Sequence, residues 1–175
     1  IAEGRLDPAA FRRYEAGLDY TKEINLMLIG DCKMVSASAW WDPAFGSASG
    51  DASVLAIVFT DEAGAYWLHR LEYIRAQSDS EQDEATQQCR KVAQVLKELY
   101  VPSVAVEING IGRFLPNILR RELANARVPC AVREVSSNRA KDIRIMEAFD
   151  IVLAARLLYV HGGVYATRLI GEVRA

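Results

Sequence analysis

Two acidic residues, Asp42 and Glu107, stand where the sequence predicts buried β-strands. Asp42 ends an alternating stretch and is followed by Pro-Ala-Phe-Gly, and Glu107 lies inside the apolar run Val-Ala-Val-Glu-Ile. A buried carboxylate is costly unless it is paired or holds a cation. Two carboxylates at the tips of strands indicate a site for a divalent metal ion, and such a site is suited to phosphodiester chemistry.

Cleavage of a phosphodiester needs a nucleophilic water and relief of charge on the scissile phosphate. Two Mg²⁺ or Mn²⁺ ions, about 3.5–4 Å apart, can supply both. Hard cations prefer carboxylate oxygens, and the carboxylates must come from adjacent strands in order to converge. We therefore predict that Asp42 and Glu107, 65 residues apart, are catalytic metal ligands. The alternative is a salt bridge that supports the fold, for example between Asp42 and Lys141.

Further candidates lie near these two positions or in the basic part of the chain. Asp51 follows a flexible Gly-Ser turn and is either an outer metal ligand or a cap of that turn. Asn109 lies two positions after Glu107, where it can touch substrate or orient a water. Lys141 and Arg144 share one face of a predicted helix, either to grip a DNA backbone or as a solvated edge.

The elements expected to position these residues begin with strands. Val35–Trp41 alternates with a period of two, and Val54–Thr60 and Ala65–Ile74 follow after short turns, which predicts an antiparallel meander. Before them, Pro8–Leu18 is predicted to be a short helix capped by Asp7. Trp40 and Trp41 are predicted to pack in the core.

The rest of the chain alternates between helix and strand. The expected elements are a helix at Glu81–Tyr100 capped by Ser80, a strand at Val104–Ile108, a helix at Arg113–Ala126, a strand at Cys130–Val135, a helix at Ala140–Ala155, a strand at Leu157–Val160 and a turn at Gly162–Val164. This order predicts an α/β fold: a ribonuclease H-like mixed sheet, with a three-strand antiparallel meander plus parallel strands and helices on both faces. The first strand of the meander is central, and the fourth strand lies beside it.

Composition and charge set broad limits. Apolar residues make up 51% of the 175 residues and charged residues 25%, as in a soluble globular domain, and no apolar run is long enough for a membrane helix. The three cysteines form no zinc-binding pattern and are predicted to be reduced, buried thiols. Residues 1–112 carry 10 Lys and Arg against 17 Asp and Glu, whereas residues 113–175 carry 11 against 6. The second part therefore favours an anionic partner.

Three segments resemble the nuclease domain of the large terminase subunit of tailed bacteriophages, the DNA-packaging motor protein. They are Trp41-Asp-Pro-Ala-Phe-Gly through Asp51, Val104-Ala-Val-Glu-Ile-Asn-Gly-Ile-Gly112, and Ser137-Asn-Arg-Ala-Lys-Asp-Ile-Arg144. The resemblance implies a metal-dependent endonuclease that cuts concatemeric double-stranded viral DNA at the start and end of packaging in the host cytoplasm. It implies Asp42 and Glu107 as metal ligands, with Asp51 as a neighbour, and Mg²⁺ or Mn²⁺, as two ions, as cofactor. Asn109, Arg139, Lys141 and Arg144 are then predicted to contact DNA.

Two features depart from that family. Its third acidic motif is not found by Ala175, since Asp142 and Asp150 do not fit its position, and we expect that ligand beyond Ala175. The ATPase motor half is missing too, because the sequence holds no Gly-x-x-x-x-Gly-Lys-Ser/Thr phosphate loop. We therefore expect residues 1–33 to be an N-terminal helix or linker remnant and residues 34–175 to be the nuclease domain. In the full-length protein, the partners implied are the motor domain, the portal and the small terminase.

Three other interpretations stay open. A catalytically silent ribonuclease H-like module would bind DNA or proteins without cutting. An actin-like phosphotransferase half shares the strand order, and tight ATP binding would favour it. A junction resolvase or integrase shares the fold and differs by preferring branched DNA or particular ends.

Overall fold

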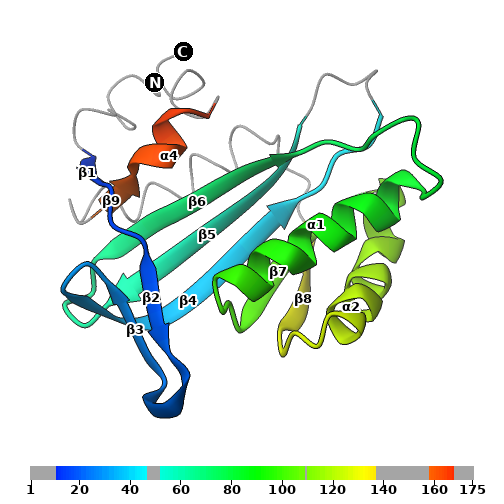
Figure 1. The fold of residues 1–175 in the computed structure, drawn as a ribbon. Helices are drawn as coiled ribbons and strands as arrows, with labels where there is room; N and C mark the ends of the chain where they lie inside the picture. The colour runs from blue at the N-terminus through cyan, green and yellow to red at the C-terminus, as the bar shows by residue number, and fades with distance from the viewer. Residues whose placement is uncertain (1–10, 47–51, 109, 137–157, 168–175) are drawn as a thin grey trace. The chain divides into compact units, whose positions relative to one another are not determined.

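The structure is a computed structural model that describes residues 11–46, 52–108, 110–136 and 158–167 (Figure 1). Within these residues the chain forms two compact units. One unit contains residues 11–36, 58–71 and 158–167, and the other contains residues 37–46, 52–57, 72–108 and 110–136. The domain boundary predicted between residues 33 and 34 is not tested by this division and stays a prediction.

The strands are β1 (Arg12–Tyr14), β2 (Leu18–Thr21), β3 (Leu26–Ile29), β4 (Cys32–Asp42), β5 (Ser53–Asp61), β6 (Tyr66–Ile74), β7 (Ser103–Glu107), β8 (Ala131–Val135) and β9 (Leu158–His161). The α-helices are α1 (Glu84–Glu98), α2 (Leu115–Asn125) and the short α4 (Gly162–Tyr165). Single turns of 3₁₀-helix occupy Lys22–Ile24 and Gly110–Phe114.

The sheet has the predicted strand order. β5 lies between β6 and β4, and β7 pairs with β4 on one side and β8 on the other. Both pairings of β7 are parallel, with Ala39 opposite Val104 and Ser103 opposite Ala131. The predicted strands of the meander correspond to β4, β5 and β6. β4 and β5 are longer than expected, and β6 begins one residue later than expected. The ribonuclease H-like mixed sheet is therefore confirmed.

The turn between β5 and β6 is stabilised by hydrogen bonds of Asp61, the last residue of β5. Asp61 closes the turn with its backbone, because its N–H donates to the carbonyl of Ala65 at 3.0 Å. Its carboxylate accepts hydrogen bonds from the N–H groups of Ala63 and Ala65, both at 2.9 Å, and from the indole of Trp67 at 2.9 Å. Gly64 adopts φ +86°, a conformation that glycine reaches without steric cost. This buried aspartate therefore serves the turn.

The predicted helix at Pro8–Leu18 is wrong over its described part. Residues 12–14 form β1, which pairs in parallel with β9, and Leu18 begins β2. The local pattern favoured a helix, but Tyr14 packs edge-on against Trp67 with ring centroids 4.8 Å apart. Strand pairing and aromatic packing therefore override the weak helical propensity. Asp7 and Pro8 lie outside the described residues.

Helix α1 begins later than predicted, because Asp83 and not Ser80 is its N-cap. The Asp83 carboxylate accepts hydrogen bonds from the backbone N–H and the hydroxyl of Thr86, both at 2.8 Å. These bonds, led by the one from the backbone N–H, lower the pKa of Asp83. The Ser80 hydroxyl instead accepts from the N–H of Gln82 at 3.2 Å. The predicted apolar face of α1 is confirmed as buried: Ala85, Cys89, Val92, Val95, Leu96 and, just beyond the helix, Leu99.

Several smaller predictions are corrected. Cys89 is buried as expected, but Cys32 is exposed, since it begins β4 beside a surface turn. Trp41 has no exposed surface, whereas Trp40, on the opposite face of β4, is 41% exposed and is not a core residue. Gly162–Val164, predicted as a turn, forms most of α4. The helix predicted at Ala140–Ala155 lies outside the described residues.

The described part of the chain contains no helix long and apolar enough to cross a membrane.

A cluster of aromatic and imidazole rings joins β1, β6 and β9. The Tyr14 hydroxyl lies 2.8 Å from Nδ1 of His69, and the rings of His69 and His161 have centroids 5.1 Å apart. Burial, with smaller contributions from the charges of His161 and Arg70, lowers the pKa of His69 to about 4. Burial also raises the pKa of Tyr14. His69 is therefore neutral in the folded protein near pH 7.

Acidification is expected to destabilise the fold through His69. Between pH 6.5 and 4 the unfolded chain protonates this histidine and the folded chain does not, so unfolding takes up protons. The stabilisation is complete above about pH 6.5 and is lost as the pH falls through about 4. Thermal unfolding of the native protein and of His69→Gln across this range measures the effect. The variant is expected to lose less stability on acidification, and equal losses would contradict the assignment.

Candidate functional site

The register of β4 and β7 brings the two predicted carboxylates together. Trp41 lies opposite Val106 in this parallel pair, and Asp42 and Glu107 are each the next residue and the last of their strands. They therefore lie opposite one another at the carboxyl ends of neighbouring strands, which are about 4.8 Å apart in a sheet. Side chains alternate along a strand, so both are on the face opposite to that of Trp41 and Val106.

The two carboxylates differ in burial. Glu107 is 2% exposed and follows Val104, Ala105 and Val106, none of which is more than 1% exposed. Asp42 is partly exposed at the end of β4. This arrangement gives the site one deep oxygen donor and one donor near the surface.

The donor set fits a hard divalent cation. Carboxylate oxygens are the ligands that Mg²⁺ and Mn²⁺ prefer, and Mg²⁺ is often bound by one or two carboxylates together with waters and substrate phosphates. In the described residues no group of three or more His, Cys, Asp or Glu is gathered in a way that could hold a metal ion. The site as described therefore rests on Asp42 and Glu107 alone.

The other predicted site residues lie outside the described residues. These are Asp51, Asn109, Arg139, Lys141 and Arg144. The salt bridge considered between Asp42 and Lys141 also falls there. Their roles stay predictions.

The backbone around Asp42 is held by side chains from other elements. On one side, the indole N–H of Trp41 donates to the hydroxyl of Ser53 at 2.9 Å, which ties the end of β4 to the start of β5. On the other side, Nε2 of Gln88 donates to the carbonyl of Ala44 at 2.8 Å. Glu84 accepts a hydrogen bond from the N–H of Gly46 at 3.1 Å.

Gln88 and Glu84 were not among the predicted site residues. The signal that marks Gln88 is its position: it is a polar residue on the apolar face of α1, directly before Cys89. Sequence alone does not say which backbone group such a buried amide meets. That depends on where the loop after β4 runs.

The segments that follow the two carboxylates also contact each other. Phe45, three residues after Asp42, packs against Phe114, at the end of the 3₁₀ turn that follows β7, with ring centroids 6.2 Å apart. Phe114 is 48% exposed. An aromatic pair therefore links the two segments that leave the candidate site.

The chain matches the terminase RNase H-like domain family over residues 39–174, a range that contains both carboxylates. No curated protein matches it in sequence. Among solved structures, the nuclease domain of the large terminase subunit of bacterial virus Sf6 has a TM-score of 0.40 and 12% identity over 62% of this chain and 42% of that chain. This chain thus spans about two fifths of that structure's length.

Two Holliday junction proteins are also similar in structure. The yeast mitochondrial Holliday junction resolvase has a TM-score of 0.45 and 9% identity, over 71% of this chain and 66% of that chain. RuvC from T. thermophilus, in complex with a Holliday junction substrate, has a TM-score of 0.37 and 16% identity, over 58% of this chain and 65% of that chain.

Proposed function

The chain belongs to the terminase RNase H-like domain family, and from this premise we propose that it is a metal-dependent endonuclease domain that cleaves double-stranded DNA during viral genome packaging. The observation that carries the proposal is the parallel pairing of β4 with β7, which puts Asp42 beside Glu107 at the carboxyl ends of both strands. Like charges at directly opposite positions of neighbouring strands repel one another. A cation between them turns the repulsion into attraction.

Asp42 and Glu107 are proposed to hold Mg²⁺ or Mn²⁺, with Asp51 as a neighbouring ligand. A divalent cation held there would help to activate a water for attack and would offset charge on the phosphate, and a second ion would offset charge on the leaving oxygen. Glu107 is proposed to hold its carboxylate in a fixed orientation, because a side chain that is 2% exposed in a close-packed interior has little freedom. Asp42, nearer the surface, lies where a substrate phosphate can approach.

The DNA is proposed to lie against the basic part of the chain. Residues 113–175 carry five more Lys and Arg than Asp and Glu. Within that part, Arg139, Lys141 and Arg144 are proposed to contact backbone phosphates without reading sequence, and Asn109 is proposed to contact the substrate near Glu107. In the full-length protein, the partners proposed are an ATPase motor domain, the portal and the small terminase, in the host cytoplasm.

Nicking of supercoiled plasmid is the experiment that tests this function. The expected result is open-circular and linear DNA in the presence of Mn²⁺ or Mg²⁺, and intact plasmid once the metal is chelated. DNA binding without cleavage at any metal concentration would instead identify a catalytically silent module.

Salt is expected to weaken DNA binding steeply. Each phosphate contact contributes about 0.9 to the slope of log affinity against log salt concentration. Replacing Arg139, Lys141 and Arg144 by alanine is therefore expected to reduce the slope by about 2–3. Fluorescence anisotropy with duplex DNA at several salt concentrations measures the slope. Lys22→Ala, an exposed lysine on the 3₁₀ turn after β2, is the control, and an unchanged slope in the triple variant would remove these residues from the interface.

A further inference from the structure

The segment that follows Asp42 is not part of a β-strand. Pro43 has no N–H to donate, and β4 ends at Asp42. Two side chains of α1 take over: Gln88 donates from Nε2 to the carbonyl of Ala44 at 2.8 Å, and Glu84 accepts from the N–H of Gly46 at 3.1 Å. Two hydrogen bonds to side chains of α1 thus hold the backbone at Ala44 and Gly46.

The side chains of Gln88 and Glu84 also contact each other, on the face of α1 that is turned toward the loop after Asp42. Glu84 and Gln88 are four residues apart, so they lie on one face of α1, and Nε2 of Gln88 is 3.4 Å from Oε1 of Glu84. Gly46 adopts φ +73°, and its N–H donates to the same Oε1 of Glu84. One carboxylate oxygen therefore links the loop backbone to the glutamine amide.

Burial of Gln88 at this position costs folding free energy. It is 1% exposed, and within the described part of the chain its Oε1 is buried without a hydrogen-bond partner. A leucine or methionine would fill the same volume without this cost, since an unpaired buried polar atom costs about 1–3 kcal/mol. The bond to the Ala44 carbonyl is the interaction that a glutamine makes there and an apolar residue cannot.

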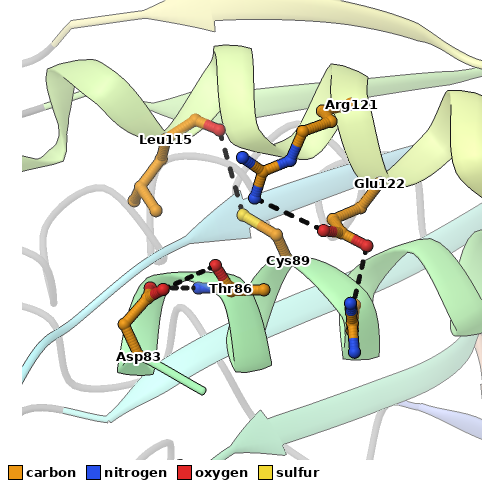
Figure 2. A network of polar contacts seen from close by, with 7 residues as sticks. Asp83, Thr86, Cys89, Leu115, Arg121 and Glu122 are labelled. Carbon is orange, nitrogen blue, oxygen red and sulfur yellow. Dashed lines mark hydrogen bonds and ion pairs between the residues drawn. The ribbon is translucent and has the colours of Figure 1, made fainter. Parts of the chain in front are cut away.

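Helix α1 is itself fixed, so it can act as a support (Figure 2). Its first turn is capped by Asp83 through Thr86. Against α2, the thiol of Cys89 lies 3.9 Å from the carbonyl of Leu115. The nearly buried Glu122 of α2 accepts from Arg90 of α1 at 3.1 Å, and from Arg121 at 3.5 Å. Figure 2 shows the contacts of Asp83 with Thr86 at the start of α1, and the contacts of Cys89 and Glu122 where α1 faces α2.

We propose that Gln88 and Glu84 are positioning residues that fix the backbone after Asp42 and thereby orient the Asp42 carboxylate toward Glu107. The consequence for metal binding rests on the proposed function; the consequence for the loop does not. Groups that do not touch the metal ion but hydrogen-bond to its ligands and orient them commonly contribute about 10–100-fold to metal affinity or activity. We expect an effect at the lower end of this range, about tenfold, because Gln88 and Glu84 bond the backbone two and four residues after Asp42.

The variant that tests the inference is Gln88→Met, which keeps the volume and removes the donor. Its matched control is Gln94→Met, on the exposed side of the same helix, where the amide donates to Glu98. In metal-free protein, amide hydrogen exchange at residues 44–46 is expected to be about tenfold faster in Gln88→Met. Exchange at Leu119 of α2 serves as an internal reference for global unfolding. If Gln88→Met fails to fold, Glu84→Ala tests the same link at Gly46.

Unchanged exchange at residues 44–46, or an equal increase in Gln94→Met, would overturn the inference. Calorimetric titration with Mn²⁺ gives the second readout, in which Gln88→Met is expected to bind about tenfold more weakly and Gln94→Met like the native protein. Faster exchange with native Mn²⁺ affinity would also overturn it, because the loop would then not orient Asp42. Absence of Mn²⁺ binding by the native protein would refute the proposed function, and the exchange measurement would still decide the inference.

Discussion

Replacing Asp42 by asparagine is expected to lower the rate of plasmid nicking by roughly 10³-fold. Asparagine keeps the size of the side chain and removes its charge. Transition-state stabilisation by a bound metal ion is worth several kcal/mol, and each 1.36 kcal/mol is one decade in rate. Glu107→Gln is expected to have a similar effect, because both carboxylates stand at the same edge of the β4–β7 pair. Initial rates at saturating Mn²⁺ measure both.

The control for this pair is Asp19→Asn, an exposed aspartate on β2 in the other unit. It changes the net charge of the protein by the same amount and is expected to nick plasmid at the native rate. Nicking by Asp42→Asn at more than a tenth of the native rate would exclude Asp42 from the metal site. A loss in one variant only would leave a site built on a single carboxylate.

Addition of Mn²⁺ is expected to raise the melting temperature by roughly 5–10 °C. A ligand that binds only the folded state at 100 times its Kd stabilises that state by about 2.7 kcal/mol. For a chain of this size, each kcal/mol shifts the melting temperature by about 2–4 °C. The shift in melting temperature reports metal binding without any need for DNA cleavage. It therefore tests whether the protein binds a metal ion independently of whether it cleaves DNA. Differential scanning fluorimetry over a Mn²⁺ titration measures it.

Glu107→Gln is expected to abolish most of that shift. The substitution preserves the shape of a residue that is 2% exposed, so the variant tests the charge and not the packing. The exposed Glu98→Gln, at the end of α1, is the matched control and is expected to shift like the native protein. An equal shift in native protein and Glu107→Gln would place the cation elsewhere in the molecule.

The elements with strong periodicity were predictable from sequence. The alternation at Val35–Trp41 corresponds to β4, and the apolar run that contains Glu107 corresponds to β7. The order of strands and helices then predicted that these two strands are neighbours, because a meander followed by crossovers allows few arrangements. The parallel register confirms that adjacency.

Two predictions from the sequence were wrong: the helix at Pro8–Leu18 and the N-cap at Ser80. The pattern at residues 11–18 favoured a helix, but pairing of β1 with β9, more than 140 residues away in sequence, made it a strand. Ser80 and Asp83 are both residue types that favour the N-cap position, and in the structure Asp83 occupies it. The pairing of β1 depends on a contact between distant residues, which local propensity does not contain.

By itself the sequence determined that Asp42 and Glu107 lie at or next to the ends of two strands, because hydrophobic periodicity depends only on neighbouring residues. Only the tertiary structure decided what surrounds them: the register that sets one opposite the other, and the α1 side chains of Gln88 and Glu84 that hold the loop after Asp42. A hydrogen bond between residues 44 positions apart is a matter of geometry in three dimensions. Residue types along the chain specify the donor, and the fold alone specifies the acceptor.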